Sequence, residues 1–294
     1  MTFSLHENIE FIETARRFET SSLKRKVVKT KEADIHLFAE KLRVPEFKKN
    51  ISRPRLNELL TKSSIQFGAT LVCGRAGTGK TALAADFARK YKNVSWYSVE
   101  SAESDWNTFS KYLTAGIFEN NSHKTLFGKD TESNSIQEKI SKFLSKLFSQ
   151  IGAAYKNESL LIVLDDIHHV FDAEWFNDFL HLLIYSLLPN VNLLLLSRSK
   201  PSAPLWRLRS KQILNVIDEK LLALSVEETE QLYNNYGLNT EHAKKAHRDT
   251  FGRISKLKIL KRNASKRQCD EFGNILHPDE RDRRPNIPCE SGFR

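Results

Sequence analysis

Short apolar runs alternate with amphipathic segments through the middle of the chain, and this alternation predicts its elements. The apolar runs have strand length and lie at 70–73, 94–99, 160–164, 191–196 and 213–217. Between them, apolar residues recur every three or four positions, as on one face of a helix, at 81–91, 106–113, 136–151 and 175–188. Uninterrupted apolar strands are typical of a parallel sheet that helices cover on both faces. The pattern therefore predicts an α/β domain with a parallel sheet of about five strands.

The two ends of the chain are more polar than its middle, and this contrast divides the sequence. One amphipathic helix is expected between Ile9 and Phe18, and a short helix around Leu56 to Leu60. Ser225 and Glu228 form a capping box that starts a further helix. The sequence predicts an N-terminal helical and linker segment (1–50), the α/β domain (51–222), part of a helical subdomain (223–260) and a disordered tail (261–294).

Composition narrows the class of protein. Hydrophobic residues make up 40% of the 294 residues and charged residues 28%, which suits a soluble globular chain. No apolar run approaches the roughly 18–20 residues of a membrane helix, and residues 1–10 lack the core of a signal peptide. The three cysteines form no CxxC or Cys/His cluster, which argues against a disulfide framework or structural zinc. We expect a cytoplasmic protein without a membrane partner.

The net charge of +10 raises the alternative of a nucleic-acid binder. Basic clusters occur at 24–26 and 256–262. Neither cluster is interleaved with aromatic residues, and no known DNA-binding motif is visible. Positive charge spread over solvated surfaces is the simpler interpretation.

Residues 74–81 read Gly-Arg-Ala-Gly-Thr-Gly-Lys-Thr and fit the pattern GxxxxGK[ST] between a strand and a helix. In such a loop glycines let successive backbone N–H groups point at phosphate oxygens, and the following helix adds its positive end. Lys80 is expected to reach the β- and γ-phosphates, and the Thr81 hydroxyl to bind Mg²⁺. The predicted phosphate-binding residues are Gly74, Arg75, Ala76, Gly77, Thr78, Gly79, Lys80 and Thr81.

Charged residues at two strand ends could complete this site. Asp165 is the expected Mg²⁺ partner, and Asp166 could position or deprotonate the attacking water. The alternative is that both acids merely end a strand and cap the next helix. Arg198 could touch the γ-phosphate or lie on the surface. His168 is expected to be a packed or surface histidine within reach of the site.

Five ordered blocks give the chain a family resemblance between about Val44 and Leu257. The blocks are GRAGTGKT, VSWYSVE with DWNTFSKYL, LLIVLDDIHHV, LLLLSRSKPSAPLWRLRS and LLALSVEETEQL. Together they resemble the nucleotide-binding domain of STAND ATPases, in the branch of large LuxR-type regulators typified by the maltose-regulon activator. Thr250-Phe251-Gly252 loosely resembles the glycine motif of the family's helical subdomain.

The resemblance implies a fold and a mode of action. The expected strand order is 5-1-4-3-2, as in AAA+ relatives. ADP would hold a closed monomer, ATP and an inducer would open it for self-association, and slow Mg²⁺-dependent hydrolysis would reset it. In this scheme Lys80 and Thr81 bind phosphate and Mg²⁺, Asp165 orients Mg²⁺, Asp166 serves the water and Arg198 senses the γ-phosphate. No sensor or helix-turn-helix is visible, so a truncated family member is expected.

The sequence thus leaves three functional hypotheses. The first is an ATP-binding, slowly hydrolysing switch module of a transcriptional regulator. The second is a non-catalytic scaffold that bound nucleotide stabilises. The third is the basic nucleic-acid binder, whose affinity would fall steeply with salt.

Overall fold

A computed structural model describes residues 27–28, 37–47, 51–118, 135–156, 158–254 and 256–257. The helix expected between Ile9 and Phe18 and the tail at 261–294 lie outside these residues. The chain divides into two compact units, Met1–Leu222 and Ala223–Arg294, which we describe separately. Within the described ranges no helix is both long and apolar enough to cross a membrane.

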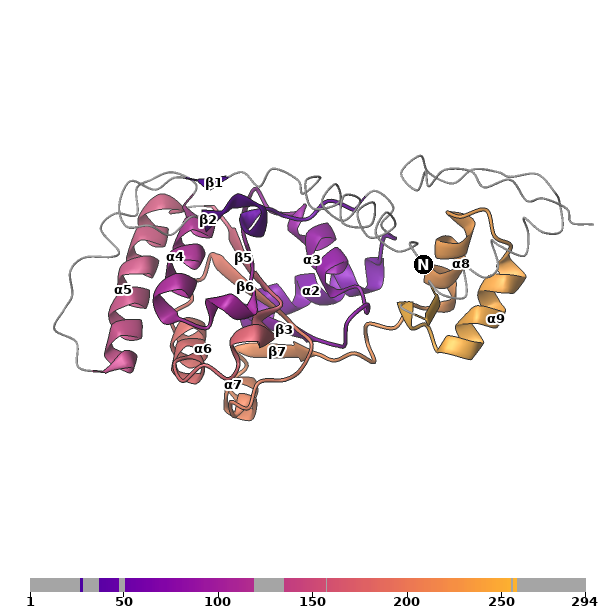
Figure 1. Cartoon of the computed structure of the whole chain (residues 1–294). Coiled ribbons are helices and arrows are strands. Elements are labelled where there is room, and N and C mark those ends of the chain that lie inside the picture. The colour runs from indigo at the N-terminus through magenta and orange to yellow at the C-terminus, as the bar shows by residue number, and fades with distance from the viewer. Residues whose placement is uncertain are drawn as a thin grey trace, which may run out of the picture. The chain divides into compact units, whose positions relative to one another are not determined.

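A parallel sheet of five strands forms the centre of the first unit (Figure 1). The strands are β3 (Ala69–Cys73), β4 (Asn93–Ser98), β5 (Leu160–Asp165), β6 (Val191–Ser197) and β7 (Leu214–Ile217). They lie in the order β4-β5-β6-β3-β7. Counted within this sheet the order is 2-3-4-1-5, which is the expected 5-1-4-3-2 from the other edge. The expected α/β fold is therefore confirmed. A short antiparallel pair, β1 (Val27–Val28) and β2 (Leu37–Phe38), is separate from it.

The helices of this unit largely follow the predicted periodicity. They are α2 (Pro54–Phe67), α3 (Lys80–Ala88), α4 (Trp106–Ile117), α5 (Ile136–Ala154), α6 (Phe176–Tyr185) and α7 (Leu205–Ser210). The described residues also form the 3₁₀ turns η1 (Ala39–Leu42), η2 (Ser101–Glu103) and η4 (Ile167–Val170). Helix α2 is longer than the short helix expected around Leu56. Helix α7 was not predicted, because its 6 residues are too few to show a helical period.

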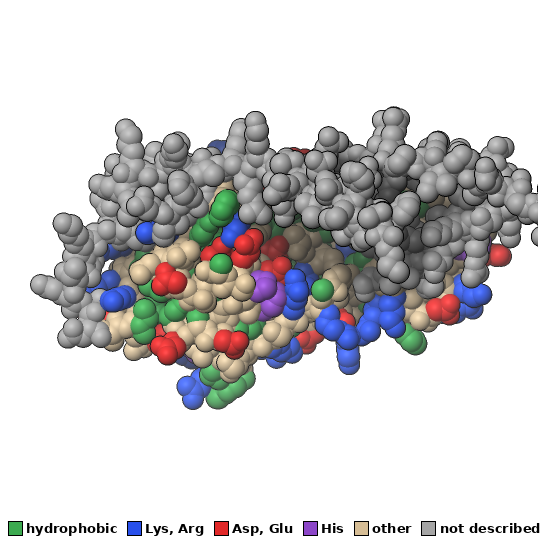
Figure 2. Space-filling view, viewed as in Figure 1, with side chains coloured by type: hydrophobic (Ala, Val, Ile, Leu, Met, Phe, Trp, Pro, Cys, Tyr) green, Lys and Arg blue, Asp and Glu red, His purple; other side chains and the backbone are tan. Residues whose placement is uncertain are grey.

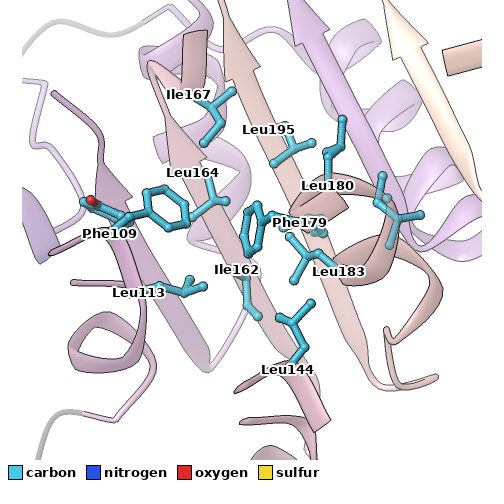
Figure 3. Close-up of a cluster of buried hydrophobic side chains, with 14 of the residues drawn as sticks. Phe109, Leu113, Leu144, Ile162, Leu164, Ile167, Phe179, Leu180, Leu183 and Leu195 are labelled. Atoms are coloured by element: carbon cyan, nitrogen blue, oxygen red, sulfur yellow. The ribbon is translucent and has the colours of Figure 1, made fainter. Parts of the chain in front are cut away.

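Both faces of the sheet are buried, as the uninterrupted apolar strands predict. On β5, Ile162 and Leu164 belong to a cluster that α4, α5 and α6 cover (Figure 3). Leu161 and Val163 point to the opposite face and join a second cluster with α2 and α3. Side chains alternate between the two faces of a strand, so one continuous apolar run serves both clusters.

The second unit contains α8 (Val226–Asn234) and α9 (Thr240–Thr250). The predicted capping box is present, because the Ser225 hydroxyl accepts from Glu228 N while the Glu228 carboxylate accepts from Ser225 N. After α9, Gly252 has a φ of 70°, and a Cβ there would lie 2.2 Å from the Leu224 carbonyl oxygen. Only glycine fits this position without moving the backbone.

Candidate nucleotide-binding site

The glycine-rich loop connects β3 to α3 at the carboxyl end of the sheet. Gly77 and Gly79 have φ values of 78° and 84°, a left-handed conformation that favours glycine. Gly79 directly precedes the first turn of α3. The N–H of Gly74 donates to the Ser197 carbonyl at 3.0 Å, which fixes the start of the loop to the end of β6. The loop therefore has the strand–loop–helix setting that its sequence predicts.

Lys80 lies buried in the curve of this loop, with 6% of its surface exposed. Its Nζ donates to the Gly74 carbonyl at 2.5 Å and to the Arg75 carbonyl at 3.2 Å. Burial lowers the pKa of Lys80, while the nearby charges of Asp166 and Asp165 act in the opposite direction. The ammonium group is thus held at the loop and faces the two strand-end acids.

Asp165 ends β5 as a buried carboxylate, with 4% of its surface exposed. The Thr81 side chain hydrogen-bonds to it, and the N–H of Asp166 donates to its Oδ1 at 2.9 Å. Burial, helped by repulsion from Asp166, raises the pKa of Asp165 to about 6. A buried carboxylate beside a hydroxyl is a donor set that suits Mg²⁺, and a cation there would favour the ionised form. These residues fit the proposed metal.

Asp166 directly precedes η4 and has an uncommon backbone conformation, with a φ of 52°. Its Oδ1 lies 3.6 Å from Arg198 Nε, at the end of β6, and 3.7 Å from His168 Nδ1. Non-glycine residues in this region store strain, which clusters at functional sites. On the face shown in Figure 2, histidine side chains lie between acidic and basic ones. The structure thus brings Asp166 and Arg198 together beside Lys80.

His168 packs at the edge of this cluster rather than standing in solvent. Its ring lies 4.3 Å from the ring of His169, centroid to centroid. Burial lowers the pKa of His168, and the neighbouring His169, Arg198 and Lys80 act in the same direction, against Asp166. The neutral imidazole is therefore favoured at neutral pH.

The side chain of Arg75 forms an ion pair outside the cluster of Lys80, Asp165 and Asp166. Its guanidinium pairs with the Glu219 carboxylate at 3.0 Å, and its backbone N–H donates to the same carboxylate at 3.1 Å. Ala76 and Gly77 are exposed at the tip of the loop, and the Thr78 hydroxyl donates to the Arg75 carbonyl at 2.9 Å.

Sequence reasoning missed Glu219. It follows β7, the strand next to β3, just as Asp165 and Asp166 end β5. The signal was available, because carboxyl ends of parallel strands meet at one edge of the sheet. Applying that rule to every strand would have placed Glu219 beside the loop.

Comparison with known proteins finds similarity over the region that contains the glycine-rich loop. Residues 66–196 match a family model described as an AAA domain. The chain is 29% identical over 187 residues to the HTH-type transcriptional regulator MalT of Vibrio cholerae, covering 63% of the chain and 20% of the regulator. MalT of Yersinia pestis is 29% identical over 182 residues, covering 60% and 20%. The chain thus spans about a fifth of the length of these relatives.

Solved structures with a similar arrangement include a Walker-type ATPase of Pyrococcus abyssi, with a TM-score of 0.41 and 12% identity, covering 76% of this chain and 75% of that one. The Aeropyrum pernix ORC1 protein in complex with DNA has a TM-score of 0.42 and 16% identity, covering 74% and 59%. The expected relationship to the large LuxR-type regulators rests on the matches in sequence to the AAA domain and to MalT. Residues 66–196 are an AAA-type P-loop domain, and the chain is related to the corresponding part of the MalT regulators.

Proposed function

We propose that this domain binds ATP with Mg²⁺ and hydrolyses it slowly, as the nucleotide switch of a LuxR-type regulator in the cytoplasm. The observation that carries the proposal is that Lys80 and Thr81 meet the buried carboxylate of Asp165 and both favour its ionised form. Lys80 lies at the same place, held by the loop carbonyls. An ammonium group and a hydroxyl at the start of α3, together with a carboxylate at the end of β5, match the needs of a magnesium nucleotide.

Each residue has a chemical task in this proposal. The loop N–H groups and the start of α3 bind phosphate oxygens, and Lys80 contacts the β- and γ-phosphates. Thr81 and Asp165 would hold Mg²⁺, which would neutralise charge on the phosphates. Asp166 orients the attacking water or accepts its proton.

Arg198 links hydrolysis to conformation. Its Nε lies 3.6 Å from Asp166 Oδ1, and about half of its side chain (49%) is exposed. A γ-phosphate carries more negative charge than one carboxylate, so ATP draws the guanidinium towards itself and ADP leaves it with Asp166. A ligand shifts an equilibrium only through such a difference between the two states. ATP-dependent self-association is the expected output.

Phosphate release in the presence and absence of Mg²⁺ tests the proposal. We expect slow, Mg²⁺-dependent release from the unmodified protein and a strong reduction in Asp166→Asn. The matched control is Asp172→Asn, which neutralises an exposed carboxylate after η4. Equal release from the unmodified protein and Asp166→Asn would contradict the switch and favour a scaffold that nucleotide merely stabilises.

A further inference from the structure

A surface around α7 combines exposed aromatic and basic side chains away from the nucleotide site. We call it the α7 surface and define it by Trp206, Arg207, Arg209, Lys211 and Gln212, all exposed. Figure 2 shows hydrophobic and basic side chains gathered over α7 at the lower edge of the view. From 179 to 217 the sequence contains no Asp or Glu. The positive charge of this surface is therefore not neutralised from within its own stretch of chain.

The α7 surface contains a cavity of about 500 Å³. Its lining combines two aromatic side chains, two amides, a hydroxyl, a leucine and a guanidinium, from Phe67, Trp206, Arg209, Ser210, Gln212, Leu214 and Asn215. Phe67 precedes β3, and Leu214 and Asn215 begin β7, whereas the glycine-rich loop follows the end of β3. Because β3 and β7 are parallel, the cavity and the loop lie at opposite ends of these strands.

Trp206 differs from the other tryptophans of the chain. It is 65% exposed, whereas Trp96, Trp106 and Trp175 are 1%, 8% and 5% exposed. An exposed indole ring offers a large flat apolar face on which an aromatic ligand can stack. The Arg207 guanidinium lies 5.3 Å from the centre of the Trp206 ring system.

A second cation–aromatic pair lies on the same surface. Lys211 Nζ lies 5.2 Å from the centre of the Tyr185 ring. Cations and aromatic rings interleaved in this way are the combination that single-stranded nucleic acids need, because their phosphates attract the cations and their bases stack on the rings. The basic clusters singled out in the sequence lacked this interleaving.

We propose that the α7 surface binds single-stranded nucleic acid, with one base stacked on Trp206 at the cavity and the neighbouring phosphates on Arg207, Arg209 and Lys211. The exposed amide of Gln212 is available to hydrogen-bond the edge of the base. An acidic protein segment would use the cations alone and leave the aromatic and amide wall without a role. The site is independent of ATP binding, since it lies at the other end of the strands.

Tryptophan fluorescence and anisotropy together test the proposal on the full chain. A short, fluorescein-labelled oligodeoxythymidine strand should bind and quench the emission of Trp206, the one tryptophan open to stacking. Trp206→Leu should weaken binding by roughly tenfold, as expected when one stacked base is lost, and should abolish the quenching. The logarithm of affinity should fall with the logarithm of salt concentration with a slope near −2, for about three neutralised phosphates.

Two double variants separate this surface from general positive charge. Arg209→Gln with Lys211→Gln should weaken binding and flatten the salt dependence. Lys92→Gln with Lys139→Gln removes two exposed cations outside the surface and should leave binding unchanged. Unchanged affinity of Trp206→Leu for ATP shows that the variant is folded.

Several results would overturn the proposal. One is absence of oligonucleotide binding, and another is binding that Trp206→Leu leaves unaltered. Displacement of the oligonucleotide by polyglutamate at equal charge concentration would assign the surface to an acidic protein instead. Self-association of the unmodified chain that Trp206→Leu abolishes would assign it to a second copy.

Discussion

Two regions of the same sheet differ in what they bury. The core beneath α4, α5 and α6 buries aromatic rings, whereas the carboxyl edge buries charged groups. In the core, Trp106, Phe109 and Trp175 pack with ring centroids 4.8–6.3 Å apart, and their burial stabilises the fold. At the edge, Lys80 and Asp165 are buried although burial disfavours their charged forms.

The difference between these regions shows which part of the domain contributes stability and which part lowers it. The core gains free energy by removing apolar surface from water. At the edge, buried charges and strained backbone lower the stability of the folded protein. Binding of a charged ligand would compensate for this loss. Mutations in the core should therefore change stability, and mutations at the edge should change binding, often with the opposite effect on stability.

The largest effect is expected from Phe109→Ala in the core. Phe109 is fully buried (0% exposed), so truncation should lower the free energy of unfolding by about 3–5 kcal/mol. Urea unfolding followed by circular dichroism measures it. Trp206→Ala is the matched control, because truncating an exposed aromatic side chain should change stability by less than about 0.5 kcal/mol. Equal losses in the two variants would refute the packing assigned to the core.

Asp165→Asn should change the free energy of unfolding in the opposite direction and raise it. The pKa of about 6 means that, between about pH 4 and 6, the folded protein keeps a proton that the unfolded chain has lost. Stability therefore falls as pH rises through this window, and above it the cost is up to about 3 kcal/mol. The asparagine variant should be more stable than the unmodified protein at pH 8 and equal to it at pH 4.

Thermal unfolding of the nucleotide-free proteins across this pH range measures the difference. Asp172→Asn removes an exposed carboxylate but keeps Asp165, so it should unfold like the unmodified protein at each pH. If Asp165→Asn is less stable than the unmodified protein at pH 8, the hydrogen bonds of Asp165 contribute more free energy than the burial of its charge costs. Mg²⁺-dependent phosphate release should be lost in Asp165→Asn at every pH.

Lys80→Ala tests the binding role of the edge. Loss of a charged hydrogen-bond donor to phosphate is worth about 1.5–3 kcal/mol, so affinity for ATP should fall roughly 10- to 100-fold. Isothermal titration calorimetry measures it. Lys90→Ala, at an exposed lysine after α3, is the control and should bind ATP normally. Unchanged affinity in Lys80→Ala would remove the basis of the site.

The smallest effect is expected at two residues with strained backbone, Asp166 at the carboxyl edge of the sheet and Gln212 before β7, at the opposite end of the strands. Asp166 and Gln212 have φ values of 52° and 55°, so glycine at either position should stabilise the folded protein by about 1 kcal/mol. Only Asp166→Gly should also abolish phosphate release, which makes Gln212→Gly the matched control. Destabilisation by both substitutions would show that the side-chain contacts outweigh the strain.

Much of the fold was readable from sequence, since it rests on local patterns. The stripe of α5, the apolar runs of β5 and β6, and the glycine-rich loop each carry their own signal. Helix α7 was not readable, because so short a helix forms on contacts made elsewhere in the fold. The same holds for the conformation of Asp166, which depends on where β5 meets η4. The pairing of Arg75 with Glu219 needed the position of β7 in the sheet.

The position of β6 between β3 and β5 has a consequence for biosynthesis. The ribosome makes the glycine-rich loop and Asp165 well before it makes Val191–Ser197, the strand that must lie between them. A nascent chain that ends after β5 already contains the glycine-rich loop and Asp165. It lacks β6, the strand that pairs with both β3 and β5 and so aligns them. Completion of the sheet during synthesis must therefore wait for β6, and until then the apolar strands β3 and β5 lack their central partner and stay open to aggregation.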